Sequence, residues 1–107
     1  MMKSIVWFVI AAFAEIAGCY SFWMILRLKG SPTHLAWGLP ALVLFAYALT
    51  KVESSHAGRA YATYSAIYLI ASLVWMRGVE GVSPDRWDLV GSAVCLAGGA
   101  IILFAPR

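Results

Sequence analysis

An apolar run of 23 residues, from position 4 to position 26, contains only one acidic or basic side chain, that of Glu15. As an α-helix this run is long enough to cross the hydrocarbon core of a bilayer. Three further apolar runs follow at residues 35–50, 60–76 and 89–105. Hydrophobic residues make up 63% of the chain and charged residues 12%, whereas a soluble domain has about half apolar and about a quarter charged residues. The sequence therefore predicts an all-α, polytopic membrane protein.

Short charged breaks separate the four runs and set the limits of the expected helices. We predict transmembrane helices near residues 4–27, 33–51, 58–77 and 87–105, in a single transmembrane domain that covers residues 1–107. The helix ends extend past the apolar runs, because long polar side chains can reach the membrane interface from there. Tryptophans near the run ends fit an aromatic belt; they are Trp7, Trp37, Trp75 and Trp87.

Glu15 lies near the middle of the first run. Placing a carboxylate at that depth costs about 3 kcal/mol or more, and intramembrane acids usually mark ion or proton pathways. We interpret Glu15 as a functional acid that faces the interior of the protein or a wet cavity. The alternative is a protonated carboxyl group that only hydrogen-bonds to a neighbouring helix.

Small and aromatic side chains share the helix face of Glu15. At about 100° per residue, the positions expected to line a cavity beside the carboxyl group are Ala11, Gly18 and Phe22. Small residues either let another helix approach or leave space for a ligand.

Aromatic side chains form a stripe along the third expected helix. Its members are Tyr61, Tyr64, Tyr68 and Trp75. A phenol hydroxyl needs a hydrogen-bond partner inside a membrane. If the stripe faces Glu15, the tyrosines can donate hydrogen bonds to the carboxylate and present π faces to a bound cation, with Trp75 lining the same cavity. Ordinary aromatic packing between helices is the alternative.

Small residues on one face of the fourth expected helix form a close-packing seam: Gly91, Cys95 and Gly98. Helices in lipid approach closely where side chains are small, so we expect this seam to hold a homodimer. It could equally pack within one chain. Each side of the membrane would carry four basic residues, which gives neither orientation an advantage. Two opposed copies are therefore modestly favoured over parallel ones.

Several functions are not expected from this chain. Its only histidines, His34 and His56, are expected at helix ends on opposite sides of the membrane, so no metal site is predicted. We find no phosphate-binding glycine loop and no nucleophile–histidine–acid set, so neither a cofactor nor enzymatic catalysis is expected. The basic residues are spread evenly, which argues against a nucleic-acid partner.

Three segments resemble the YnfA-type membrane proteins, relatives of the small multidrug resistance transporters. They are EIAGC at residues 15–19, GRAYATY at residues 58–64 and WMRGVEGV at residues 75–82. The fourth-helix segment at residues 88–103, with glycines seven apart, is similar to the dimer helix of those transporters. The resemblance covers the whole chain and implies a four-helix bundle, a bacterial inner-membrane homodimer and efflux of toxic cations or drugs. Tyr64 departs from the transporters, which usually carry tryptophan there.

The function predicted from these features is proton-coupled export. Desolvation favours the neutral form of an acid, so Glu15 could take up and release a proton near neutral pH. A small or lipophilic cation and a proton would then compete for Glu15 in a homodimer whose protomers rock against each other. The alternatives are a non-transporting membrane subunit or scaffold, and a channel-like leak for a small cation.

Overall fold

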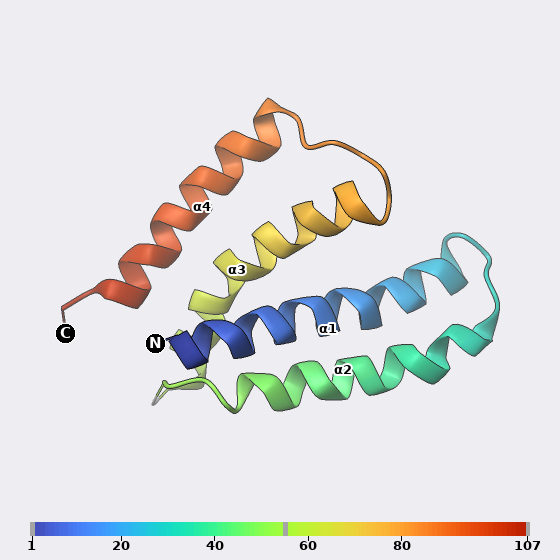
Figure 1. The fold of residues 1–107 in the computed structure, drawn as a ribbon, viewed down its shortest axis with the longest axis horizontal. Coiled ribbons are helices and arrows are strands. Elements are labelled where there is room, and N and C mark those ends of the chain that lie inside the picture. Colours follow the sequence, from blue (N-terminus) through green and yellow to red (C-terminus); the bar gives the residue numbers. More distant parts are fainter. Residues whose placement is uncertain (1, 55, 107) are drawn as a thin grey trace. The chain divides into compact units, whose positions relative to one another are not determined.

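A computed structural model describes residues 2–54 and 56–106 of the chain. In these residues it contains four α-helices and one short 3-10 helix, η1, but no strand (Figure 1). Their bounds are Met2–Leu26 for α1, Pro32–His34 for η1, Leu35–Leu49 for α2, Ala57–Gly78 for α3 and Arg86–Phe104 for α4. This confirms the predicted all-α class.

Among the described residues, three segments are long and apolar enough to cross a membrane. They are Lys3–Leu26, Pro32–Leu49 and Arg86–Phe104. α3 is less apolar because it carries Arg59 and three tyrosines among its 22 residues. A fourth span at residues 58–77 and a single domain over residues 1–107 stay predictions.

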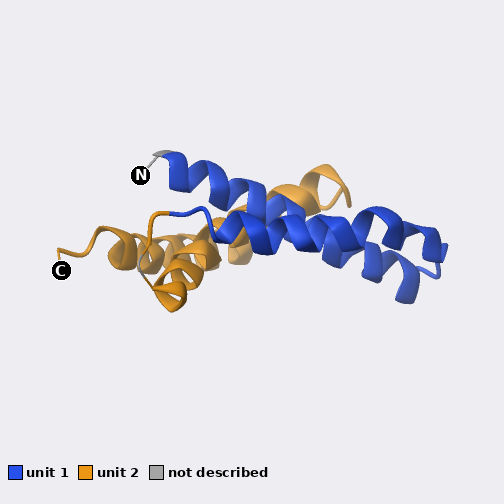
Figure 2. Ribbon diagram, turned by 90° about the horizontal axis from the view of Figure 1, so that it is seen from below, with its two compact units in different colours: residues 1–52 blue, residues 53–107 orange. Residues whose placement is uncertain are grey.

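Two compact units make up the chain, Met1–Val52 and Glu53–Arg107 (Figure 2). Each unit is a helical hairpin. Unit 1 pairs α1 with α2, and unit 2 pairs α3 with α4.

The hairpin of unit 1 is packed through small residues. Gly38 of α2 lies against Ser21 of α1, and a Cβ atom on Gly38 would overlap that side chain. Gly18 makes room in the same way for Leu42. The Ser21 hydroxyl donates a hydrogen bond of 2.5 Å to the Gly18 carbonyl, inside its own helix. The serine thus buries its polar group while its small size lets α2 approach.

In unit 2 the closest approach is made by a different glycine. A Cβ atom on Gly99 of α4 would lie 2.6 Å from the Cβ of Ala66 in α3. Between the loop-proximal parts of the same two helices there is an open cavity of about 430 Å³. α3 and α4 also contact each other less extensively than α1 and α2 do.

The first helix of each hairpin ends with the same hydrogen-bond pattern. The carbonyls of Trp23 and Trp75 each accept from the N–H groups four and five residues further on, over 2.7–3.4 Å. The carbonyls of Met24 and Met76 each accept from the N–H group six residues further on, at 2.7 and 3.0 Å. The two connections therefore share one backbone design.

A residue with positive φ makes each of these turns possible. Lys29 has φ 57° in unit 1, and Gly81 has φ 74° in unit 2. A Ser-Pro pair follows two residues later in both cases. Each residue of unit 2 in this comparison lies 52 positions after its counterpart in unit 1.

Polar caps begin the helix after each connection. Asp85 and Asp88 form a capping box on α4, in which each carboxylate accepts the other residue's backbone N–H, at 2.9 and 3.0 Å. In unit 1 the Ser31 hydroxyl accepts the N–H of Thr33 at 3.3 Å, and Pro32 begins η1. These bonds satisfy donors that a helix start leaves without an intrahelical partner.

Cationic side chains stack on aromatic rings at three helix ends. Arg27 lies 4.5 Å from the Trp23 ring centre, Lys51 lies 5.0 Å from that of Tyr47, and Arg86 lies 5.0 Å from that of Trp87. Such pairs combine an apolar ring with a hydrated cation, which suits the membrane–water interface.

Candidate functional site

Glu15 lies in the middle of α1 and is half-buried. It lies about 60° around the helix from Gly18 and about 120° from Ser21. Because Gly18 and Ser21 face α2, Glu15 lies at the margin of the α1–α2 contact rather than at its centre. A carboxyl group at such a margin can be reached by a further helix or by a ligand.

The three predicted neighbours of Glu15 differ in their surroundings. Ala11 is fully buried, whereas Phe22 is 39% exposed. Gly18 is buried and its open side is occupied by Leu42 of α2. Gly18 thus serves helix packing in unit 1. The cavity-lining roles of all three residues stay predictions.

The tyrosines of α3 occupy graded environments. Tyr64 is buried, Tyr68 is half-buried and Tyr61 is 54% exposed. The rings of Tyr64 and Tyr68 are in contact, with centroids 5.9 Å apart and planes tilted by 57°. Trp75, further along the stripe, is half-buried. The structure therefore brings two of the three predicted cation-binding tyrosines into one aromatic pair.

The tyrosine stripe lies on the side of α3 opposite to α4. Tyr64 and Tyr68 are each about 160° around the helix from Ala66, the residue that contacts Gly99 of α4. Within unit 2 the stripe is thus available to elements other than α4. Glu15 and the tyrosines belong to different units, and their meeting in one site stays a prediction.

The predicted α4 seam lies on an exposed face of unit 2. Gly91, Cys95 and Gly98 are all exposed, and a Cβ atom on either glycine would meet open space. Gly99, which contacts α3, is about 80–100° around the helix from the two seam glycines. The residue that packs α4 onto α3 is therefore distinct from the seam, and the dimer role of the seam stays a prediction.

Two features of the structure were missed by sequence reasoning. One is the close contact of Gly38 with Ser21, because a single glycine in an apolar run has no repeating pattern to mark it. The other is the cavity in unit 2, which depends on the size of facing side chains. In residues 2–54 and 56–106, no group of three His, Cys, Asp or Glu side chains could hold a metal ion.

Comparison with known proteins connects the chain to one family. A family model described as "Uncharacterised BCR, YnfA/UPF0060 family" matches residues 1–107. A "UPF0060 membrane protein" of Ectopseudomonas mendocina (strain ymp) is 58% identical over 106 residues, which cover 99% of this chain and 96% of the relative. No solved structure matches. The chain belongs to the YnfA/UPF0060 family and is a membrane protein, as the resemblance predicted.

Proposed function

We propose that this member of the YnfA/UPF0060 family is a proton-coupled exporter of small or lipophilic cations in the bacterial inner membrane. Proton and substrate exchange at Glu15 in a homodimer, without a cofactor and without covalent chemistry. The observation that carries this proposal is one half-buried acid in the middle of an apolar 25-residue helix. An ionisable side chain at that depth carries a cost in free energy, so its presence indicates a function, most commonly ion or proton transfer.

The aromatic pair of α3 supports a cationic rather than an anionic substrate. The rings of Tyr64 and Tyr68 are in contact, so this pair brings two π faces and two hydroxyl groups close together. Both π faces and a carboxylate attract a lipophilic cation electrostatically, whereas both repel an anion. In this proposal Glu15 supplies the negative charge and the exchangeable proton, and the tyrosines favour substrates of positive charge and matching shape.

The test replaces the acid and measures transport under a proton gradient. In proteoliposomes loaded with a fluorescent lipophilic cation, wild-type protein is expected to move the cation in the direction opposite to the proton flow. Glu15→Gln removes the exchangeable proton but keeps the size and hydrogen bonding of the side chain, so coupled transport should be lost. Glu15→Asp keeps the proton and should retain part of the activity.

A matched control replaces an exposed acid outside the predicted site. Glu80→Gln, in the exposed connection between α3 and α4, should leave transport unchanged. The exporter proposal fails if wild-type protein and Glu15→Gln give the same flux across several cations. A wild type without transport, together with normal folding of Glu15→Gln, would instead support the scaffold alternative.

The dimer component is tested separately at the α4 seam. Gly98→Leu should weaken self-association in a crosslinking assay, because a large side chain keeps the partner helix away. Ala97→Leu is the matched control, since Ala97 is also exposed but lies about 100° further around α4. Cysteine labelling of both termini in intact cells tests the opposed arrangement, which requires each terminus on both sides of the membrane.

A further inference from the structure

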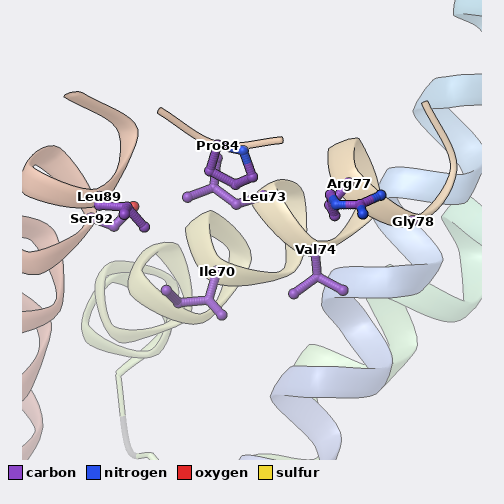
Figure 3. Close-up of a pocket in the computed structure, with 8 residues that line it drawn as sticks. All are labelled: Ile70, Leu73, Val74, Arg77, Gly78, Pro84, Leu89 and Ser92. Carbon is purple, nitrogen blue, oxygen red and sulfur yellow. The ribbon is translucent and has the colours of Figure 1, made fainter. Parts of the chain in front are cut away.

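The open cavity of unit 2 has a well-defined place in the hairpin. It lies between the last two turns of α3, the connecting segment and the first turns of α4. Its volume of about 430 Å³ is in the range of small-molecule sites. Figure 3 shows Leu73 and Pro84 between Arg77 on one side and Leu89 on the other. Nothing in the proposed transport mechanism uses this cavity.

The walls of the cavity are almost entirely carbon. Ile70, Leu73 and Val74 supply the α3 wall, and Pro84 and Leu89 supply the opposite one. Ser92 adds a hydroxyl group, but it donates to the Asp88 carbonyl in its own helix. A ligand for this space must therefore be a hydrocarbon over most of its length.

One charged residue lines the cavity, and it is basic. Arg77 lies in the last turn of α3, is exposed and lines the cavity. The two carboxylates at the start of α4 accept backbone N–H groups of their own capping box. Glu80 is exposed in the connecting segment and does not line the cavity. The one charged side chain that lines the cavity is thus the Arg77 guanidinium, which repels the cationic substrate proposed above.

The mouth of the cavity lies where lipid headgroups are expected. Trp87 is 68% exposed and carries the Arg86 guanidinium over its ring, at the same end of the hairpin as Arg77. An exposed tryptophan with an adjacent arginine is typical of the membrane interface. From Ile70 to Gly78 the α3 wall extends about 12 Å toward the hydrocarbon core.

We propose that this cavity binds one phospholipid with an anionic headgroup. One acyl chain lies along the wall formed by Ile70, Leu73 and Val74, and the phosphate pairs with the Arg77 guanidinium. The planar guanidinium donates two parallel hydrogen bonds to phosphate oxygens, a geometry that lysine does not reproduce. An anionic headgroup is preferred because the one charged side chain that lines the cavity is the Arg77 guanidinium.

Occupation by a second copy of the chain is less compatible with the geometry. The α4 seam and the cavity use different sides of α4, since Gly91 is about 100° around the helix from Ser92. A dimer held by the seam therefore leaves the lipid in place. The lipid headgroup would then lie next to the segment that connects α3 to α4.

The test compares two lipids in one membrane. The protein is placed in nanodiscs that contain equal amounts of phosphatidylglycerol and phosphatidylcholine, and native mass spectrometry counts the lipids retained per chain. One interfacial arginine contributes about 1 kcal/mol toward an anionic lipid, so wild-type protein should retain phosphatidylglycerol about fivefold over phosphatidylcholine. Arg77→Gln should remove the preference, and Arg77→Lys should restore part of it.

Two controls separate the cavity from a general charge effect. Arg86→Gln removes a neighbouring cation that does not line the cavity, so the preference should persist. Val74→Trp fills the cavity and should displace the retained lipid, whereas Val94→Trp, at an exposed site of α4, should not. Equal retention of the two lipids by wild type, or equal losses from Arg77→Gln and Arg86→Gln, would overturn the proposal. So would a disulfide between the chains of Val74→Cys, which would assign the cavity to a partner helix.

Discussion

The two hairpins end their first helices with the same turn but pack their helices differently. In unit 1, Gly18 and Ser21 of α1 let α2 approach until Gly38 touches Ser21. At the positions 52 residues on, unit 2 has Ile70 and Leu73. Both of these larger side chains line the cavity between α3 and α4. Small side chains at these positions thus accompany close packing in unit 1, and larger ones accompany an open cavity in unit 2.

The same comparison separates two kinds of chemistry. Glu15 in α1 has Ile67 as its counterpart in α3, so the half-buried acid belongs to one hairpin only. The tyrosine stripe and the Arg77 cavity belong to the other. Unit 1 is thus a tightly packed hairpin that contains a single acidic residue, and unit 2 presents aromatic and apolar surfaces. Substitutions at four sites test this difference between the two hairpins.

The largest effect is expected at the closest contact of unit 1. Gly38→Ala introduces a Cβ atom that overlaps Ser21, and overpacking of this kind costs about 2–3 kcal/mol of the free energy of unfolding. Thermal unfolding in detergent measures the loss. Ser21→Gly in the same chain should recover most of it, because the colliding atoms are gone.

The control for this prediction is Gly78→Ala, at the last residue of α3. No atom lies within 4 Å of its Cβ position, so stability should change by less than about 0.5 kcal/mol. A Gly38→Ala variant as stable as Gly78→Ala would show that small residues do not hold unit 1 together.

A smaller effect is expected at the closest contact of unit 2. Gly99→Ala brings a Cβ atom to 2.6 Å from the Ala66 Cβ. We expect a loss of about 1 kcal/mol, at the low end for overpacking, because the open cavity lets α4 shift. Gly58→Ala, near the start of α3, is the control and points into open space. Hydrogen exchange of α3 and α4 amides should report the difference, and equal protection in both variants would contradict it.

Sequence reasoning anticipated the helical class because apolar length is a local property that one chain segment reveals. The packing role predicted for Gly91 and Gly98 of α4 stays a prediction, and the glycine that contacts α3 is Gly99, beside the seam. Contacts such as Gly38 with Ser21 depend on the register between two helices, which no single segment specifies. The same holds for the cavity, where Ile70 and Leu89 come from different helices. The predicted site around Glu15 combines both units and stays a prediction.

The third substitution tests the caps that follow the two connections. Asp85→Ala removes the acceptor for the Asp88 N–H of α4 and should cost about 1 kcal/mol. Ser31→Ala should cost only a few tenths, since its bond is 3.3 Å long and caps a three-residue helix. Asp85→Asn keeps an acceptor oxygen and should restore most of the stability. Thermal unfolding of the three variants checks the order of the stability losses. A larger loss from Ser31→Ala than from Asp85→Ala would show that the cap of unit 1 is the stronger one.

The smallest effect is expected at the turn of unit 1, where Lys29 has φ 57°. A residue with a Cβ atom is disfavoured in this region, whereas glycine adopts it readily. Unit 2 already has Gly81 at the matching position. Lys29→Gly should therefore stabilise unit 1 by about 0.5 kcal/mol, because the relief of the steric cost is partly offset by the flexibility of glycine in the unfolded chain. Lys29→Ala removes the charge but keeps the Cβ atom, so it should not stabilise the protein. Equal rises in the thermal midpoint for both variants would assign the effect to the loss of charge rather than to the backbone conformation of the turn.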